Sequence, residues 1–331
     1  MTVVLVALVL VAGCGAASGG TRSTPAASLT LDGPATARVV DDDVTPIASA
    51  PTPSLPVTVD SADGERVEVT SVDRIVAVDL YGTLGEIVFS LGLGDRVVGR
   101  DSSTGFASAA DVPVVTSGGH DLNAEAILDL NPTVVLTDSS IGPPEVQRQL
   151  RSAGIAVVFF SPDRTLEGVP AHIRSVATAL GVPAQGEALV SRVEGEIAAA
   201  RALAPPEGPR IAFLYVRGSA GVYLMAGPGS GADSMIESVG GVDVGTDIGL
   251  ARPFVPITSE ALLTAQPEVI LVMTAALDSV GGVDGLLKIP GLAQTPAGQR
   301  RRIVDVADTD LLSFGPRVGA TISALAEVLY R

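Results

Sequence analysis

Only two of the 331 residues are histidines, and one of them, His120, stands in a setting suited to ligand binding. It follows the stretch Ser117–Gly119 and precedes a helix expected to begin at Asn123. Glycines leave the backbone bare, so a flat ligand can approach it closely. Loops at strand ends are also where binding residues gather. The residue types leave a second possibility open, that His120 only helps Asp121 or Asn123 to cap the helix.

A tyrosine occupies a second glycine-rich stretch, "GSAGVYLMAGPGSG", as Tyr223. Phenolate oxygen is a favourable ligand for a hard cation such as ferric iron, whereas an ordinary tyrosine is half-buried with its hydroxyl hydrogen-bonded. Tyr215, inside an apolar strand, and Tyr81, just after one, are expected to be structural or to line a pocket. Met273 ends a buried strand, where a core role and a pocket role both remain open. His172 is expected on the solvated face of a helix.

The elements that must position these residues alternate between strands and helices. This alternation predicts an α/β fold with parallel sheets. The first half shows it over Ile75–Val78 (strand), Gly82–Leu91 (helix), Asn123–Leu130 (helix), Thr133–Thr137 (strand), 144–153 (helix) and Ala156–Phe160 (strand). The second half resumes it at Ile211–Val216, after a mostly helical stretch, 165–204, with a break near Gly181.

The two halves resemble each other. "NAEAILDLNPTVVLT" begins at Asn123 and "TSEALLTAQPEVILV" begins at Thr258. Each half also has a glutamate on a helix that runs into glycines, Glu86 in "GEIVFSLGLGDRVVG" and Glu237 in "DSMIESVGGVDV". Internal duplication indicates two similar lobes. We therefore expect two Rossmann-like lobes joined by a single long helix, with the ligand cleft between them.

The N-terminal sequence predicts a lipoprotein. "LVLVAGC" has a short apolar run and small residues before Cys14, the only cysteine, whose thiol would be acylated. The predicted parts are a signal peptide (1–13), a disordered Ser/Thr/Pro-rich tether (14–56), an N-terminal lobe (57–164), a connecting helix (165–204) and a C-terminal lobe (205–331).

The composition argues against several classes of function. A net charge of -16, with Lys288 as the only lysine, disfavours nucleic-acid binding. The sequence has no G-x-S-x-G motif, the nucleophile elbow of many hydrolases, and we expect the protein not to be an enzyme. A zinc or manganese carrier would need several histidine and carboxylate ligands, which two histidines hardly supply.

These features together resemble the helical-backbone class (class III) of ABC-transporter substrate-binding proteins. "GGHDLNAEAILDLNP", "GVYLMAG", "VMTAALDSVGGVDGLL" and "LLSFGPR" are similar to the haemin-binding lipoproteins of actinobacterial haem uptake, the HmuT-like group. The resemblance implies that the chain binds ferric haem b. A ferric siderophore or cobalamin, bound by other members of the class, is the alternative.

The resemblance also implies a ligand set. His120 and Tyr223 would bind the iron from opposite faces, with Met273 in the pocket; Arg252 and Tyr81 are further candidate haem contacts. The family usually has an arginine two residues after its tyrosine, where this chain has Met225. Arg217 and Arg252 are the candidates to take that role.

The resemblance further implies the partners. Glu86 and Glu237 would dock onto arginines of an ABC permease, which works with its ATPase. Haem would come from surface proteins or haemoproteins. We expect a monomer on the outer face of the cell membrane, held there by the lipid on Cys14.

Overall fold

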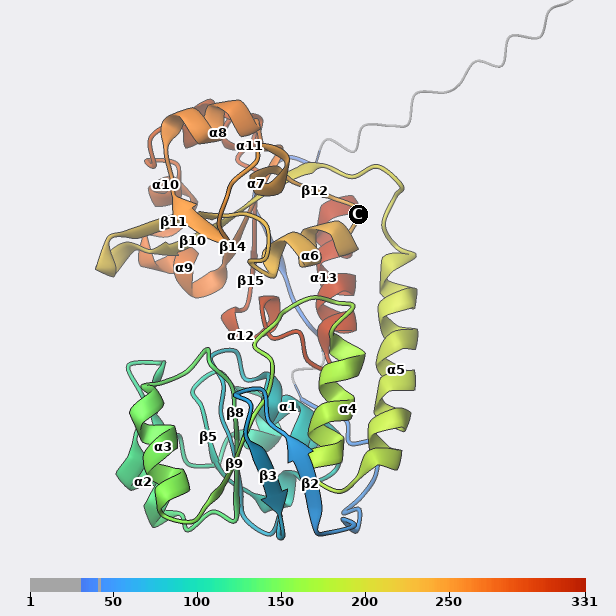
Figure 1. Ribbon diagram of the computed structural model, residues 1–331. Helices are drawn as coiled ribbons and strands as arrows, with labels where there is room; N and C mark the ends of the chain where they lie inside the picture. Colours follow the sequence, from blue (N-terminus) through green and yellow to red (C-terminus); the bar gives the residue numbers. More distant parts are fainter. Residues whose placement is uncertain (1–30, 41–42) are drawn as a thin grey trace, which may run out of the picture. The chain divides into compact units, whose positions relative to one another are not determined.

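The structure, a computed structural model, describes residues 31–40 and 43–331 (Figure 1). These residues form two α/β lobes joined by a helix, which confirms the predicted fold class. The predicted signal peptide and Cys14 lie outside the described residues. None of the helices in the described ranges is both long enough and apolar enough to span a membrane.

The N-terminal lobe is built on four parallel strands in the order β5, β4, β8 and β9. Their bounds are Val97–Arg100, Ile75–Ala77, Val134–Thr137 and Ala156–Phe159. Helices α1 (Thr83–Ser90) and α4 (Val169–Ala179) cover one face, and α2 (Ala124–Asp129) and α3 (Pro144–Ser152) cover the other. Because both faces are covered, β4 and β8 are buried along their whole length and their sequences are continuously apolar.

The C-terminal lobe has a mixed sheet in the order β1, β15, β14, β10, β11 and β13, with β12 also paired to β10. Their bounds are Ala35–Ala37, Ile303–Val306, Val269–Met273, Arg210–Arg217, Val222–Ala226, Phe254–Pro256 and Val242–Asp243. The pairs from β1 to β10 are parallel, as predicted, but β11 and β13 run antiparallel. Only Gly218–Gly221 join β10 to β11, and so short a link cannot make a parallel crossover.

Short hairpins and helices complete the two lobes. The hairpins are β2–β3 (Val57–Asp60 and Arg66–Val69) and β6–β7 (Thr116–Ser117 and Asp121–Leu122). The C-terminal lobe adds α6 (Ala232–Ser238), α7 (Val244–Asp247), α8 (Ser259–Ala265), α9 (Thr274–Ser279), α10 (Gly282–Leu286), α11 (Pro296–Arg300), α12 (Asp308–Leu311) and α13 (Val318–Tyr330).

The predicted single connecting helix is two helices. α4 ends at Ala179, and α5 spans Pro183–Arg201. Between them, Gly181 has a φ of +70°, and a Cβ there would meet the Ser54 carbonyl oxygen at 2.7 Å. The chain therefore needs glycine at the break. α4 packs against α1 in the N-terminal lobe, and α5 alone continues alongside α13 of the C-terminal lobe (Figure 1).

The predicted disordered tether is wrong for its second half, residues 31–40 and 43–56, which we call the strap. Its first part forms β1 at the edge of the C-terminal sheet. Its later part binds the N-terminal lobe: Asp43 accepts hydrogen bonds from the backbone N–H and hydroxyl of Ser108, and the N–H of Ile47 donates to the Ser90 carbonyl (2.7 Å). A polar segment becomes ordered in this way when its backbone groups pair with those of a preformed domain.

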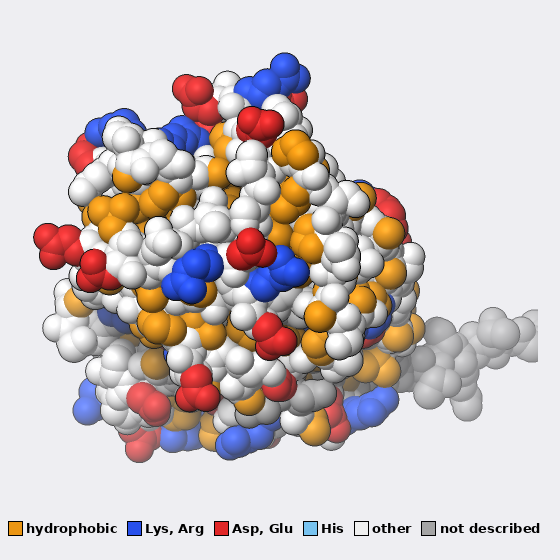
Figure 2. All heavy atoms as spheres, turned by 90° about the horizontal axis from the view of Figure 1, so that it is seen from below, with side chains coloured by type: hydrophobic (Ala, Val, Ile, Leu, Met, Phe, Trp, Pro, Cys, Tyr) orange, Lys and Arg blue, Asp and Glu red, His pale blue; other side chains and the backbone are white. Residues whose placement is uncertain are grey.

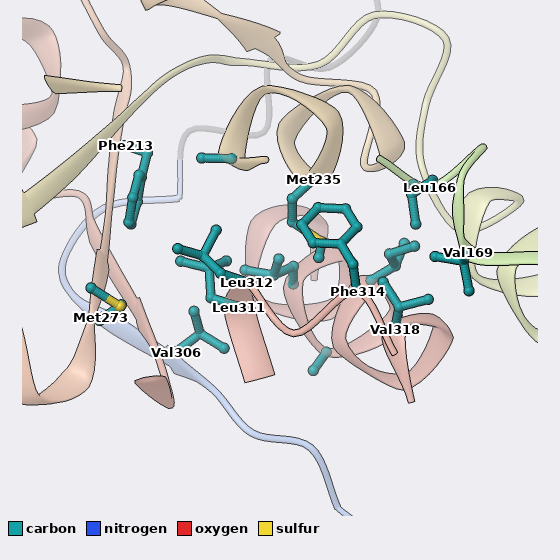
Figure 3. Packing of buried hydrophobic residues seen from close by; sticks show 14 of the residues in the cluster. Leu166, Val169, Phe213, Met235, Met273, Val306, Leu311, Leu312, Phe314 and Val318 are labelled. Carbon is teal, nitrogen blue, oxygen red and sulfur yellow. The ribbon is translucent and has the colours of Figure 1, made fainter. Parts of the chain in front are cut away.

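The described residues form two hydrophobic core clusters, one confined to the N-terminal lobe and a larger one that extends through both lobes. Figure 3 shows part of it, in which Leu312 and Phe314 lie between Met273 of β14 and Val169 of α4. Because residues of both lobes share this buried cluster, the lobes are held against each other by more than the connecting helix.

The surface carries charges of both signs. On the face in Figure 2, acidic and basic side chains are interspersed among apolar patches. Surface arginines pair with nearby carboxylates, for example Arg148 with Glu145 at 2.8 Å. The acidic side chains therefore do not form one continuous negative surface on that face.

Candidate functional site

A cavity of about 420 Å³ lies between the lobes. The N-terminal lobe contributes the loops that follow β4 and β5 and the β6–β7 hairpin, with the side chains of Tyr81, Ser102 and His120. The C-terminal lobe contributes β10, the end of β14 and α12, with Tyr215, Arg217, Met273 and Asp308. The cleft thus brings residues far apart in sequence to one place.

His120 lies at the tip of the β6–β7 hairpin, with its side chain exposed. Gly118 and Gly119, just before it, have φ values of +58° and +88°, which explains why glycine is needed there. Helix capping does not use His120, because the Asn123 side chain accepts the Ala126 N–H at 3.0 Å. The imidazole is therefore free to meet a ligand in the cleft.

Tyr223, the predicted partner of His120, does not line the cavity, and Tyr215 does. In the antiparallel pair β10–β11, Tyr215 lies opposite Leu224, and Tyr223 lies opposite Val216. Residues opposite each other share a face, and neighbours along a strand alternate between faces. Tyr215 and Leu224 face the cleft, so Tyr223 projects from the other face, where it is 37% exposed.

Of the two arginines proposed to stabilise the tyrosine ligand, Arg217 lines the cleft. Its Cζ lies 4.6 Å from the centre of the Tyr215 ring, and its Nη2 lies 3.4 Å from Asp308 Oδ1. A cation over an aromatic face is attracted by the π electrons. Arg252, the other predicted candidate, is exposed and does not line the cavity.

The other two predicted pocket residues do line the cleft. Tyr81 stacks against Arg164, whose Cζ lies 3.7 Å from its ring centre. Burial raises the pKa of Tyr81, and Arg164 opposes that effect. Met273 lines the cleft at the end of β14 and is almost fully buried.

Three buried aspartates hold the N-terminal loops of the cleft, and the sequence reasoning missed them. Asp79, Asp101 and Asp138 come directly after β4, β5 and β8 or one residue later. Asp101 accepts the N–H groups of Ser103 and Thr104 at 2.8 and 2.7 Å. An aspartate after each buried strand was the signal that could have revealed them.

Their burial shifts their acidity. Burial, and then the nearby Asp79 carboxylate, raise the pKa of Asp101 to about 7 and that of Asp138 to about 6. In the part of the chain that the structure describes, they do not combine with other groups into a cluster of three or more possible metal ligands. Their carboxylates accept backbone N–H groups of the loops that follow the strands, and these hydrogen bonds order the loops.

The predicted docking pair, Glu86 and Glu237, is not a matched pair on the surface. Glu86 is only 2% exposed, and its carboxylate accepts the backbone N–H of Arg317 from the C-terminal lobe. Glu237 is exposed on α6. Glu86 is therefore corrected from a docking residue to an interlobe contact.

The sequence repeat contains a different pair of glutamates, Glu125 and Glu260. Both are exposed in the first turn of their helices, α2 and α8. The preceding caps also match, because Asn123 and Thr258 accept the N–H three residues ahead at 3.0 and 3.1 Å. The two lobes thus present equivalent carboxylates at equivalent positions.

A larger hollow, of about 680 Å³, lies between β2 and α4 and includes His172. His172 is not solvated as predicted: its ring stacks on Phe160 at 5.9 Å and burial lowers its pKa. Its Nε2 is buried and has no hydrogen-bond partner among the residues that the structure describes. An inaccessible nitrogen cannot meet a ligand. We place the site in the smaller interlobe cleft, where His120, Tyr215 and Arg217 converge.

The chain is similar to several known binding proteins. A family model described as periplasmic binding protein matches residues 76–309. A cobalamin-binding protein of Halobacterium salinarum is 25% identical over 282 residues, which cover 84% of this chain and 75% of that protein.

Solved structures are more similar. The heme binding protein HmuT is 41% identical, with a TM-score of 0.86, over 91% of this chain and 98% of that one. Periplasmic heme-binding protein RhuT from Roseiflexus sp. RS-1 is 43% identical, with a TM-score of 0.71, over 78% and 98% of the two chains. Structures of HmuT variants replace a histidine, a tyrosine and an arginine two residues after that tyrosine with alanine.

Proposed function

Because this chain belongs to the periplasmic binding protein family, whose members serve as substrate-binding proteins in transport, we propose that it is the extracytoplasmic haem-binding component of an ABC importer. One observation carries the proposal. His120 from the N-terminal lobe and Tyr215 with Arg217 from the C-terminal lobe meet in one interlobe cleft.

The proposed cargo is ferric haem b, with the imidazole of His120 and the oxygen of Tyr215 as axial ligands. Phenolate oxygen and imidazole nitrogen are both established haem ligands. Tyr215 and Arg217 also have the tyrosine-to-arginine spacing of the residues replaced in HmuT, whereas the residue two positions after Tyr223 is Met225. We therefore assign to Tyr215 the role that the family resemblance implied for Tyr223.

The residues around His120 and Tyr215 suit a flat, charged macrocycle. Gly118 and Gly119 leave open space beside His120, since a Cβ on Gly119 would meet nothing within 4 Å. Tyr81 and Met273 add apolar surface to the walls. Arg217 is close enough to Tyr215 to offset the negative charge of a phenolate.

Cobalamin is the second candidate cargo, because a relative with that name matches most of the chain. Its identity, 25%, is lower than the 41% shared with HmuT. A corrin ring carried with its own lower ligand would not require an axial tyrosine and arginine from the protein. Replacing Tyr215 should therefore impair the binding of haem but not the binding of cobalamin, which distinguishes the two cargoes.

The decisive experiment titrates haemin, and separately cobalamin, into the purified chain and follows the visible spectrum. We expect haemin binding with a phenolate-to-iron charge-transfer band. Tyr215→Phe should abolish the band, His120→Ala should change the coordination, and Tyr223→Phe should match the wild type. Unchanged haemin spectra in Tyr215→Phe and His120→Ala would refute this ligand set, and tight cobalamin binding alone would favour the second cargo.

Delivery requires a permease and its ATPase, with which substrate-binding proteins of ABC importers work. We propose that Glu125 and Glu260 are the carboxylates that meet the permease, because they are exposed and equivalent in the two lobes. The chain would act as a monomer on the outer face of the cell membrane, anchored by a lipid on Cys14. Haem-bearing surface proteins or haemoproteins would be its donors.

A further inference from the structure

Asp308 connects two parts of the cleft wall. It is the first residue of α12, and it lines the cavity together with Tyr215 and Arg217. Its Oδ1 lies 3.4 Å from Arg217 Nη2, and its Oδ2 accepts the backbone N–H of Ala275 at 3.0 Å. The carboxylate therefore ties the arginine of β10 to the first turn of α9, directly after Met273.

Arg217 has few other anchors. Its Nη1 donates to the carbonyl of Val216 at 3.0 Å, and its guanidinium lies over the Tyr215 ring. Neither contact fixes a long side chain against solvent, and about a third of the Arg217 side chain is exposed (35%). Holding such a side chain in one rotamer costs conformational entropy, which a second, charged partner can offset.

We propose that Asp308 is a positioning residue, which holds the Arg217 guanidinium over Tyr215 and so strengthens the oxygen ligand offered to haem iron. The proposal rests on the function proposed above. Coulombic stabilisation weakens as two charges move apart, so a guanidinium free to leave the ring would stabilise the phenolate less. Asp308 would act through its ion pair with Arg217 and not as a ligand of the iron.

The proposal differs from a purely structural role in its consequences. Asp308 also caps the start of α9 through Ala275, so its loss could loosen the cleft in general. A general loosening would weaken haem binding whether or not Arg217 is present. A positioning role acts only through Arg217 and therefore disappears when that arginine is removed.

The test is a double-mutant cycle in the full chain with Asp308→Ala, Arg217→Ala and the pair. Each variant is titrated with haemin, and the phenolate-to-iron band is recorded. We expect Asp308→Ala and Arg217→Ala each to weaken haemin binding about tenfold and to shift the band. When Arg217 is already replaced by alanine, Asp308→Ala should weaken haemin affinity by less than a further factor of about two. In the chain that keeps Arg217, Asp308→Glu should bind haemin more tightly than Asp308→Ala does.

Asp278→Ala is the matched control, because it removes the same charge from an exposed position of α9. It should leave affinity and spectrum unchanged. Additive losses in the cycle, or wild-type affinity and spectrum in Asp308→Ala, would overturn the positioning role.

Failure of the proposed function gives a different pattern. In that case Tyr215→Phe itself keeps the wild-type spectrum, and the positioning role falls with the ligand set. If Tyr215→Phe loses the band while Asp308→Ala does not change it, the ligand set stands and only the role of Asp308 is overturned.

Discussion

Glu86 and Arg317, 231 positions apart in the chain, join the two lobes through a buried contact. The backbone N–H of Arg317 donates to Glu86 Oε1, and the Arg317 Nε lies 3.7 Å from Oε2. The Arg317 Nη2 also pairs with Asp310 at 3.2 Å. Truncating one member of a buried ion pair is costly because it leaves the other charge unpaired.

This contact predicts a pH dependence of stability. Burial raises the pKa of Glu86 to about 7, despite the opposing effect of Arg317. The folded chain thus holds the Glu86 proton more tightly than the unfolded chain, so this group lowers stability as pH rises from about 4.5 to 7. Asp101 and Asp138 act in the same direction.

Glu86→Gln should remove part of this dependence, because the amide mimics the protonated carboxyl. The Tm of Glu86→Gln relative to that of the wild type should rise between pH 5 and pH 8. The corresponding change in the free energy of unfolding should be at most about 3 kcal/mol. Glu237→Gln, at an exposed position, is the control and should give a constant difference. Parallel Tm curves for Glu86→Gln and the wild type would contradict the prediction.

The strap offers a test of its own within one short segment. Val44 is 6% exposed, whereas Val40 is 98% exposed. Val44→Ala should lower the free energy of unfolding by about 1–3 kcal/mol, because it removes buried methyl groups, and Val40→Ala should leave it unchanged. Denaturant unfolding of both variants measures this. If Val44→Ala proves as neutral as Val40→Ala, the strap does not pack on the lobes in solution.

Permease docking is tested by charge reversal. Glu125→Lys with Glu260→Lys should reduce haem-dependent stimulation of the transporter's ATPase on the order of tenfold, since misplaced like charges oppose docking. Haemin affinity of the isolated double variant should stay at the wild-type value, because neither residue lines the cleft. Glu237→Lys is the control for added positive charge. Normal stimulation by the double variant would exclude this pair.

The lipid anchor is tested at Cys14. Cys14→Ser should abolish acylation, and the chain should then appear in the medium or remain unprocessed, because no thiol is left to modify. Fractionation followed by mass measurement of the N-terminal peptide checks this. A variant that stays on the membrane at mature size would show that Cys14 is not the anchor.

Local sequence determined much of the fold. The repeat that begins at Asn123 and Thr258 predicted two like lobes, and the structure shows that both residues cap their helices. The break at Gly181 was visible because glycine at a helix end has a steric reason, and the structure gives it a φ of +70°. His120 stood out because two glycines precede it, and the structure gives both a positive φ. Each of these signals depends on neighbours within a few residues.

Tertiary structure decided the rest. Tyr215 and Tyr223 both lie in strands, and only the pairing of β10 with β11, and what packs on each face, shows which one meets the cleft. Glu86 has the sequence of a surface helix residue, but Arg317 covers it from the far end of the chain. The strap reads as disordered because Thr36 finds its partner, Asp305, 269 positions away. Composition and periodicity report on near neighbours and carry no information about contacts that the folded chain alone creates.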